Sequence, residues 1–281
     1  MKKFMKQILL GAAIVMAAIG CTAADGVDGS GAVPRPTEEG VIFYAEDIYG
    51  DDNGPGTYTY PTDAVFAPGS FDLLEVKISE DGDDYLFDFT IAIPFKNEWG
   101  NEQGWDVQMF DIYLNLGEGK NTQVVAGRNV RIPEGWDKAM VVAPVGSFAM
   151  GFEIQKSMAA GYDCAESEAE NIVADVKLPD AVSVRGDTVR ARIAKAKMGD
   201  LSTLEGVQVF VLGSEGYPEE FHAYNRVVNA NSAQWRFGGG TDVDGNPNVI
   251  DILGDNSKLG NYVSEPGRIV YTEVDLIRFA D

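Results

Sequence analysis

Residues 85–93 read Tyr-Leu-Phe-Asp-Phe-Thr-Ile-Ala-Ile, and this stretch indicates the class of fold. Large apolar side chains occupy every second position, a period that predicts a long β-strand with one face buried. Residues 110–116 repeat the alternation. Shorter runs of the same type, separated by Gly, Pro, Asn and Asp, lie at residues 73–78, 139–142, 148–154, 172–178, 188–193, 207–212 and 269–277.

Helical periodicity is weak along the whole chain. The two short helix candidates lie at residues 166–172 and 198–204, and no stretch shows an apolar stripe over three helical turns. We therefore predict an all-β fold, an antiparallel β-sandwich in which each sheet buries one face against the other. Because the sequence shows no repeat and no internal linker, we expect a single domain over residues 41–281.

The first residues have the layout of a bacterial export signal. Three lysines precede an apolar run at residues 8–19, and Ala-Ile-Gly stands directly before Cys21. The run is too short to cross a bilayer, which takes about 20 apolar residues. We predict that residues 1–20 are removed, and that lipid on Cys21 anchors the protein outside the cytoplasm, on the cell membrane or the outer membrane. The alternative is a signal peptide with another cleavage site and no lipid.

The segment after this signal predicts a tether, and the overall charge excludes one class of partner. Residues 21–40 are rich in Ala, Gly, Asp and Pro, which predicts a flexible tether. The net charge is −22, and loss of the signal with its three lysines and no acidic residue gives −22 − 3 = −25. A surface with this much negative charge repels phosphate groups. The composition therefore excludes nucleic-acid binding.

Two loops, at residues 47–62 and 235–251, combine carboxylates, amides and glycines. Calcium takes six to eight oxygen ligands, and glycine lets the backbone turn so that these oxygens converge. We predict structural calcium in these loops. The candidate ligands are Asp47, Asp51 and Asp52 in the first loop and Asp242, Asp244, Asn246 and Asp251 in the second. The alternative is a pair of turns whose side chains only satisfy their own backbone.

The same two loops carry a resemblance to a known family. Residues 47–62 read Asp-Ile-Tyr-Gly-Asp-Asp-Asn-Gly-Pro-Gly-Thr-Tyr-Thr-Tyr-Pro-Thr, and residues 235–251 contain Trp-Arg-Phe-Gly-Gly-Gly and then Pro-Asn-Val-Ile-Asp. Together with motifs between them, they resemble the C-terminal domain of glucodextranases and related amylopullulanases, a DOMON-like β-sandwich. The resemblance covers residues 41–255.

That resemblance implies a fold similar to carbohydrate-binding modules, acting as a binding or cell-surface attachment unit with calcium as a structural ion. The sequence departs from the family pattern at Ile48 and Tyr49. It also carries no glycosidase domain of the kind that usually accompanies this unit. The resemblance therefore implies a free-standing module on a lipid anchor, and it names no ligand.

Tryptophan offers a second possible binding feature. A pyranose ring presents an apolar C–H face that stacks on indole, while nearby amides and carboxylates bond its hydroxyls. One loop between the two clearest strands combines both groups. The predicted carbohydrate-contact residues are Trp99, Trp105, Asn101, Gln103 and Asp106, with Trp105 ahead of Trp99. The alternative is that each indole caps the core, and for Trp235 the packing role is favoured.

Little in the sequence points to catalysis. His222 is the only histidine, no Gly-x-Ser-x-Gly elbow is present, and no pair of carboxylates stands out for glycoside hydrolysis. We expect a non-catalytic, lipid-anchored module that binds α-glucan or cell-envelope polysaccharide. Two alternatives stay open: a structural or assembly protein of the envelope, and a haem-binding DOMON-type domain with His222 or Met109 as the iron ligand.

Overall fold

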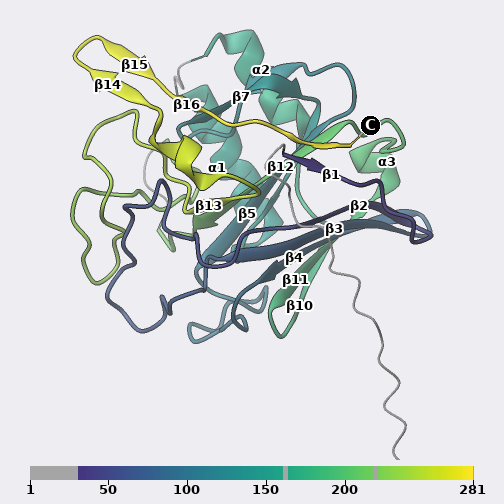
Figure 1. The fold of residues 1–281 in the computed structure, drawn as a ribbon, viewed down its shortest axis with the longest axis horizontal. Helices are drawn as coiled ribbons and strands as arrows, with labels where there is room; N and C mark the ends of the chain where they lie inside the picture. Colours follow the sequence, from purple (N-terminus) through teal and green to yellow (C-terminus); the bar gives the residue numbers. More distant parts are fainter. Residues whose placement is uncertain (1–30, 161–163, 218–220, 281) are drawn as a thin grey trace, which may run out of the picture.

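The computed structural model describes residues 31–160, 164–217 and 221–280, and it has the predicted all-β architecture (Figure 1). Two mainly antiparallel sheets face one another. The predicted signal peptide and Cys21 lie outside the described residues. Within the described part of the chain, no helix combines the length and the apolar character needed to cross a membrane.

The smaller of the two main sheets has five antiparallel strands. In spatial order these are β10 (Ala181–Arg185), β11 (Thr188–Ala194), β4 (Asp84–Ile91), β3 (Leu73–Asp81) and β2 (Val41–Glu46). The alternation at residues 85–93 forms β4, whose Phe87, Phe89 and Ile91 point into the core. Their neighbours Asp88 and Thr90 lie on the outer face, as a period of two requires.

The larger sheet has seven strands and lies above the first in Figure 1. In spatial order they are β1 (Ala32–Val33), β17 (Ile277–Phe279), β12 (Gly206–Gly213), β5 (Gln108–Asn115), β8 (Lys138–Val142) and β9 (Val176–Lys177), with β13 (Asp251–Ile252) also paired to β12. The pairs β1–β17 and β8–β9, at the edges, are parallel. A sandwich core fills the space between the two sheets.

A third layer covers the outer face of the larger sheet (Figure 1). It consists of α1 (Ser147–Ala159), α2 (Glu166–Asp175), β6 (Asn121–Gln123), β7 (Val130–Trp136) and β16 (Thr272–Glu273). Strands β5 and β12 are consequently buried on both faces. In β5, Phe110 and Ile112 enter the sandwich core, whereas Met109 and Tyr113 enter a second core beneath the helices.

Helix α1 replaces a strand that we predicted at residues 148–154, and that prediction is wrong. Its buried residues Met150, Ile154 and Met158 follow helical spacing, while Phe148 and Phe152 are 91% and 60% exposed. The four apolar residues at every second position also fit part of a helix, because short apolar runs do not distinguish the two periods. Packing of one helical stripe onto the larger sheet decides the outcome.

The folded part of the chain begins closer to the N-terminus than the sequence suggested. We expected a tether up to residue 40, but β1 pairs with β17, and Val33 is buried in the sandwich core. Lys77 also pairs with Glu38 at 3.1 Å. The described segment from residue 31 is therefore part of the folded unit. The remaining elements are α3 (Lys195–Met198), the 3-10 helix η1 (Asn256–Gly260) and the hairpin of β14 (Val263–Glu265) and β15 (Arg268–Val270).

Candidate functional site

The two loops that carry the sequence motifs lie against one another at one end of the sandwich (Figure 1). Thr59 and Gly238 exchange backbone hydrogen bonds of 2.9 Å in both directions, and Thr62 donates to the Ala233 carbonyl at 3.0 Å. A Cβ on Gly239 would lie 1.9 Å from the Thr57 carbonyl oxygen, so only glycine permits this approach. The glycine-rich motifs thus join the loops to each other.

One carboxylate from each loop meets a third from the start of β3. One ligand oxygen each from Asp51, Asp72 and Asp251 lies within 4.8 Å of the others. Asp251 begins β13 and is completely buried; it accepts hydrogen bonds from the Leu73 amide at 2.7 Å and the Asn256 side chain at 2.6 Å. These bonds fix the carboxylate of Asp251 in place at the centre of the cluster.

Asp47 adds a fourth carboxylate to the cluster, and Asp72 reaches it from the start of β3. Asp47 follows β2 directly, and one of its oxygens accepts a hydrogen bond from the Gly254 amide at 2.9 Å. Asp72 immediately precedes β3 and accepts from the Gly50 amide at 3.0 Å. Four carboxylates from the first loop, the start of β3 and the start of β13 therefore converge.

Burial, together with the charges of neighbouring carboxylates, raises the pKa of all four aspartates in this cluster. Burial is the largest cause for Asp47, whose pKa is raised to about 8, and Asp51 and Asp72 add repulsion. Burial and then the charge of Asp72 raise the pKa of Asp51 to about 7. Burial raises the pKa of Asp72 to about 6, and that of Asp251 well above its usual value. Each carboxylate favours a proton or a cation over bare ionisation.

The donor set suits a hard cation. Oδ2 of Asp47 and Oδ1 of Asp51 are buried without a hydrogen-bond partner within the described structure. An orphaned buried carboxylate oxygen is costly unless something positive binds it. Carboxylate oxygens suit calcium or magnesium, whereas zinc prefers nitrogen and sulfur. Asp47, Asp51, Asp72 and Asp251 are the residues placed to hold such an ion.

The structure divides the predicted calcium ligands differently from the sequence. Asp47, Asp51 and Asp251 come together, and Asp72 joins them although its spacing gave no signal. Asp52 lies at the edge, where its carboxylate accepts a hydrogen bond from the Tyr60 hydroxyl.

The other predicted ligands of the second loop, Asp242, Asp244 and Asn246, do not join this cluster and instead line a separate polar pocket. The Asn246 side-chain oxygen already accepts hydrogen bonds from the Thr241 amide at 2.8 Å and the Tyr262 hydroxyl at 3.0 Å. Asp242 accepts from the Ala230 amide at 2.8 Å, and Asp244 is exposed. In this loop an amide and a carboxylate group bond the backbone around them, which is the pattern that the alternative describes.

Trp105 is not a stacking residue, which is a second correction. Its side chain has no exposed surface, and its indole N–H donates to the Gln108 carbonyl at 2.8 Å. The ring packs edge-on to Phe95, at 6.5 Å between centroids. Trp105 therefore caps the sandwich core.

Trp99 instead lies beside Trp235, for which we had favoured a packing role. The two indoles are 44% and 41% exposed, and their centroids lie 5.9 Å apart with an angle of 58° between the rings. Phe66 supports Trp235 from within, at 6.2 Å. Sequence spacing did not suggest the pair, since Trp235 reaches this place through the contacts between the two motif loops.

The polar residues among the predicted carbohydrate contacts mainly hold the loop that carries Trp99 in its conformation. Asp106 accepts backbone hydrogen bonds from Glu98 and Trp99, and the Asn101 side chain donates to Asp106 and to the Trp105 carbonyl at 3.1 Å. Gln103 is half-buried. These contacts hold Trp99 in its orientation, so Asn101 and Asp106 act as positioning residues for the indole.

The two haem-ligand candidates lie in different surroundings within the described structure. Met109 is fully buried in the second core, whereas His222 borders a polar pocket beside the second motif loop that Met109 does not line. The arrangement therefore gives no support to a haem cleft between these two residues.

A two-sheet sandwich with a carboxylate cluster and an exposed aromatic pair in its end loops defines a class, the β-sandwich binding modules. The chain belongs to the family described as the C-terminal binding module, SLH-like, of glucodextranase, whose profile matches residues 42–262. No curated protein matches the chain. The family is one of binding modules rather than catalytic domains, and the match confirms the family resemblance seen in the motifs. Strands β1 and β14–β17 lie outside the matched range.

Proposed function

We propose that this protein is a non-catalytic, lipid-anchored module that binds a neutral carbohydrate, an α-glucan or a cell-envelope polysaccharide. The observation that carries the proposal is the exposed pair of Trp99 and Trp235. Indoles held by packing and by loop hydrogen bonds offer rigid apolar surface to the C–H face of a sugar ring, at little cost in side-chain entropy.

Polar groups border this pair. Gln234, beside Trp235, is exposed and donates to the Asp63 carboxylate at 3.0 Å. Glu98, beside Trp99, is also exposed. Such side chains bond sugar hydroxyls at the edge of a stacked ring. The net charge of −22 disfavours an anionic polymer, which is why we propose a neutral glycan.

We further propose that calcium is a structural cofactor, held by Asp47, Asp51, Asp72 and Asp251. Its charge would offset the burial and the mutual repulsion that raise the pKa of these groups. By joining the first loop to the starts of β3 and β13, the ion would fix the loop to which residues 233–239 are hydrogen-bonded. Calcium would thereby stabilise the position of Trp235 without contacting the glycan.

We propose that Cys21 carries the lipid anchor, on the strength of the cationic start, the apolar run and the small residues before the cysteine. Cys21→Ser should move the protein from the membrane fraction to the soluble fraction. Retention of the variant on membranes would contradict lipid anchoring. The placement outside the cytoplasm rests on the same sequence features.

The glycan proposal is tested by affinity electrophoresis in gels containing neutral polysaccharides, after a glycan array has selected them. Trp99→Ala and Trp235→Ala should each weaken binding roughly five-fold or more, because base stacking on an aromatic side chain, a comparable contact, contributes about 1–3 kcal/mol. Phe152→Ala, which removes an exposed aromatic ring on α1, is the matched control. Unchanged binding in both tryptophan variants would exclude this platform.

A second candidate function is attachment to another envelope protein. The observation that favours it is the exposed apolar pair Phe148 and Phe152, one helical turn apart on α1. In a pull-down from cross-linked cells, Phe148→Ser with Phe152→Ser should then release partners that Trp99→Ala retains. Partners that stay bound to the serine variant would exclude this patch.

A further inference from the structure

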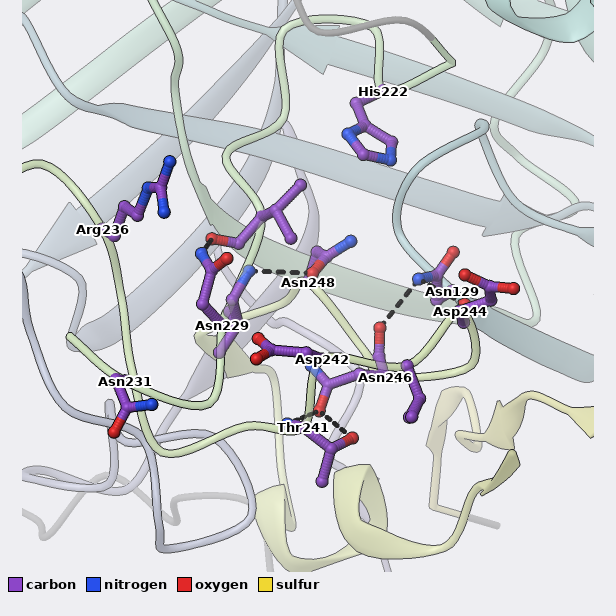
Figure 2. A pocket seen from close by; sticks show the side chains of 13 residues that line it. Asn129, His222, Asn229, Asn231, Arg236, Thr241, Asp242, Asp244, Asn246 and Asn248 are labelled. Atoms are coloured by element: carbon purple, nitrogen blue, oxygen red, sulfur yellow. Dashed lines mark hydrogen bonds between the residues drawn. The ribbon is translucent and has the colours of Figure 1, made fainter. Parts of the chain in front are cut away.

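A polar pocket of about 520 Å³ lies beside the second motif loop (Figure 2). Its volume falls within the range of about 300–1,000 Å³ that is usual for small-molecule sites. Trp99 and Trp235 do not line it, although Arg236, the residue after Trp235, does. The pocket is therefore separate from the aromatic pair but adjacent to it in the chain.

Amide side chains hydrogen-bonded to the backbone hold the floor of this pocket in place. Asn248 accepts a hydrogen bond from the Val228 amide at 2.9 Å and donates to the Gly127 carbonyl at 2.9 Å. Asn129 donates to the backbone carbonyls of Asn246 and Asp244, at 2.7 and 3.1 Å (Figure 2). These bonds connect three separate segments of the chain, so the pocket exists before any ligand arrives.

The rim keeps polar groups available. Arg236 and Asn231 are exposed, and within the described structure neither side chain makes an ion pair or hydrogen bond. The Asp244 carboxylate is exposed too, and one oxygen of Asp242 remains beyond its bond to the Ala230 amide. Donors and acceptors thus line the same pocket, and Figure 2 labels these side chains.

This lining selects the class of ligand. Hydroxyl groups donate and accept at once, so a ring with several of them can bond amide, carboxylate and guanidinium groups together. Two carboxylates on the rim and the acidic protein as a whole disfavour an anion. Three valines supply the only large apolar side chains of the lining, which disfavours an apolar ligand.

We propose that this pocket is a second saccharide site, which holds a neutral sugar unit through hydrogen bonds and without aromatic stacking. The inference rests on the proposed function, because it assumes a glycan-binding protein. A glycan held at both places would gain affinity by having two linked contacts.

The test is an NMR titration of the full chain with neutral α-1,4- and α-1,6-linked gluco-oligosaccharides of one to seven units. Side-chain amide signals of Asn231 and Asn229 report the pocket, and the indole N–H signals of Trp99 and Trp235 report the aromatic pair. We expect both sets to shift. Asn231→Ala combined with Arg236→Gln should remove the response of the Asn229 amide, weaken binding of the longest sugar at least three-fold and leave the indole shifts in place. Arg185→Gln, at an exposed arginine of β10, is the charge-matched control.

The outcomes separate the two proposals. Indole shifts without pocket shifts at saturation would overturn the second site and leave the proposed function standing. Pocket shifts without indole shifts would support the second site and remove the tryptophan platform. No response to any sugar of the series would overturn both. A pocket response to sulfate that equals the sugar response would overturn the neutral ligand class.

Discussion

The indoles of Trp99 and Trp235 lie 5.9 Å apart, although Trp99 belongs to the loop between β4 and β5 and Trp235 to the loop between β12 and β13. Their contact depends on the backbone pairing of residues 59 and 238 and on the bonds between residues 62–63 and 233–234. The contact between the two indoles therefore depends on the packing of both motif loops. For this reason the stability of variants at Trp99 is compared below with that of a variant in the core.

Trp105→Ala should destabilise the protein by about 3–5 kcal/mol, because truncation of a buried tryptophan leaves a cavity and here also removes an indole hydrogen bond. Trp99→Ala should cost far less, since Trp99 is 44% exposed. Urea unfolding of the two variants beside the wild type measures the difference. Equal stability of Trp105→Ala and the wild type would mean that Trp105 is not a core residue.

Millimolar calcium should raise the melting temperature relative to chelator. A ligand that binds only the folded state adds RT ln(1 + [L]/Kd), about 2.7 kcal/mol at one hundred times Kd. Asp51→Asn should abolish the increase, because it removes one of the clustered carboxylates. Asp244→Asn is the control in the second loop and should keep the full response. A response lost in Asp244→Asn but kept in Asp51→Asn would assign the ion to the other loop.

The stability of the chelated protein should fall as the pH rises from about 5 to about 8. The folded-state pKa values of Asp72, Asp51 and Asp47 are raised to about 6, 7 and 8, above the unfolded value of about 3.9. Their contribution to stability is complete below the unfolded pKa and is lost as the pH passes the folded pKa, because the folded state binds the protons more tightly.

Excess calcium should oppose this loss, and its stabilising effect should grow with pH as protons cease to compete for the carboxylates. Carboxyl groups with lowered pKa, such as Asp180 and Asp255, lose their contribution only below about pH 4 and so act outside this window. Thermal melts in chelator and in calcium at several pH values provide the measurement. A melting temperature in chelator that rises from pH 5 to 8 would contradict the raised pKa values.

Arg128→Met should destabilise the protein by about 3–5 kcal/mol, because it leaves the Asp111 carboxylate buried and unpaired. The native pair is bidentate, with distances of 2.7 and 3.1 Å, and neither side chain is exposed. Asp111→Leu combined with Arg128→Met should recover part of the loss, since no charge is then buried. Urea unfolding of the single and double variants tests this, and a double variant less stable than Arg128→Met would contradict it.

Local pattern was sufficient for much of the sandwich. The alternation at residues 85–93 and 110–116 predicted β4 and β5, because neighbouring side chains of a strand point to opposite faces whatever surrounds them. The glycine-rich motifs likewise marked the family and the loops that form the end of the fold. Three of the four clustered carboxylates stood within those motifs, and only Asp72 was missed.

Burial was beyond the reach of the sequence, because it depends on which distant segments meet. The sequence of β5 was taken as one apolar and one polar face, yet the third layer buries Asp111 and Tyr113 as deeply as Phe110. The sequence favoured Trp105 over Trp99 as the stacking residue, but packing buries Trp105 and leaves Trp99 exposed beside Trp235. The sequence by itself determined the long strands β4 and β5 and the chemistry of the loops. Only the tertiary structure decided which carboxylates share one space and which aromatic faces meet solvent, because those properties follow from long-range packing and not from neighbours along the chain.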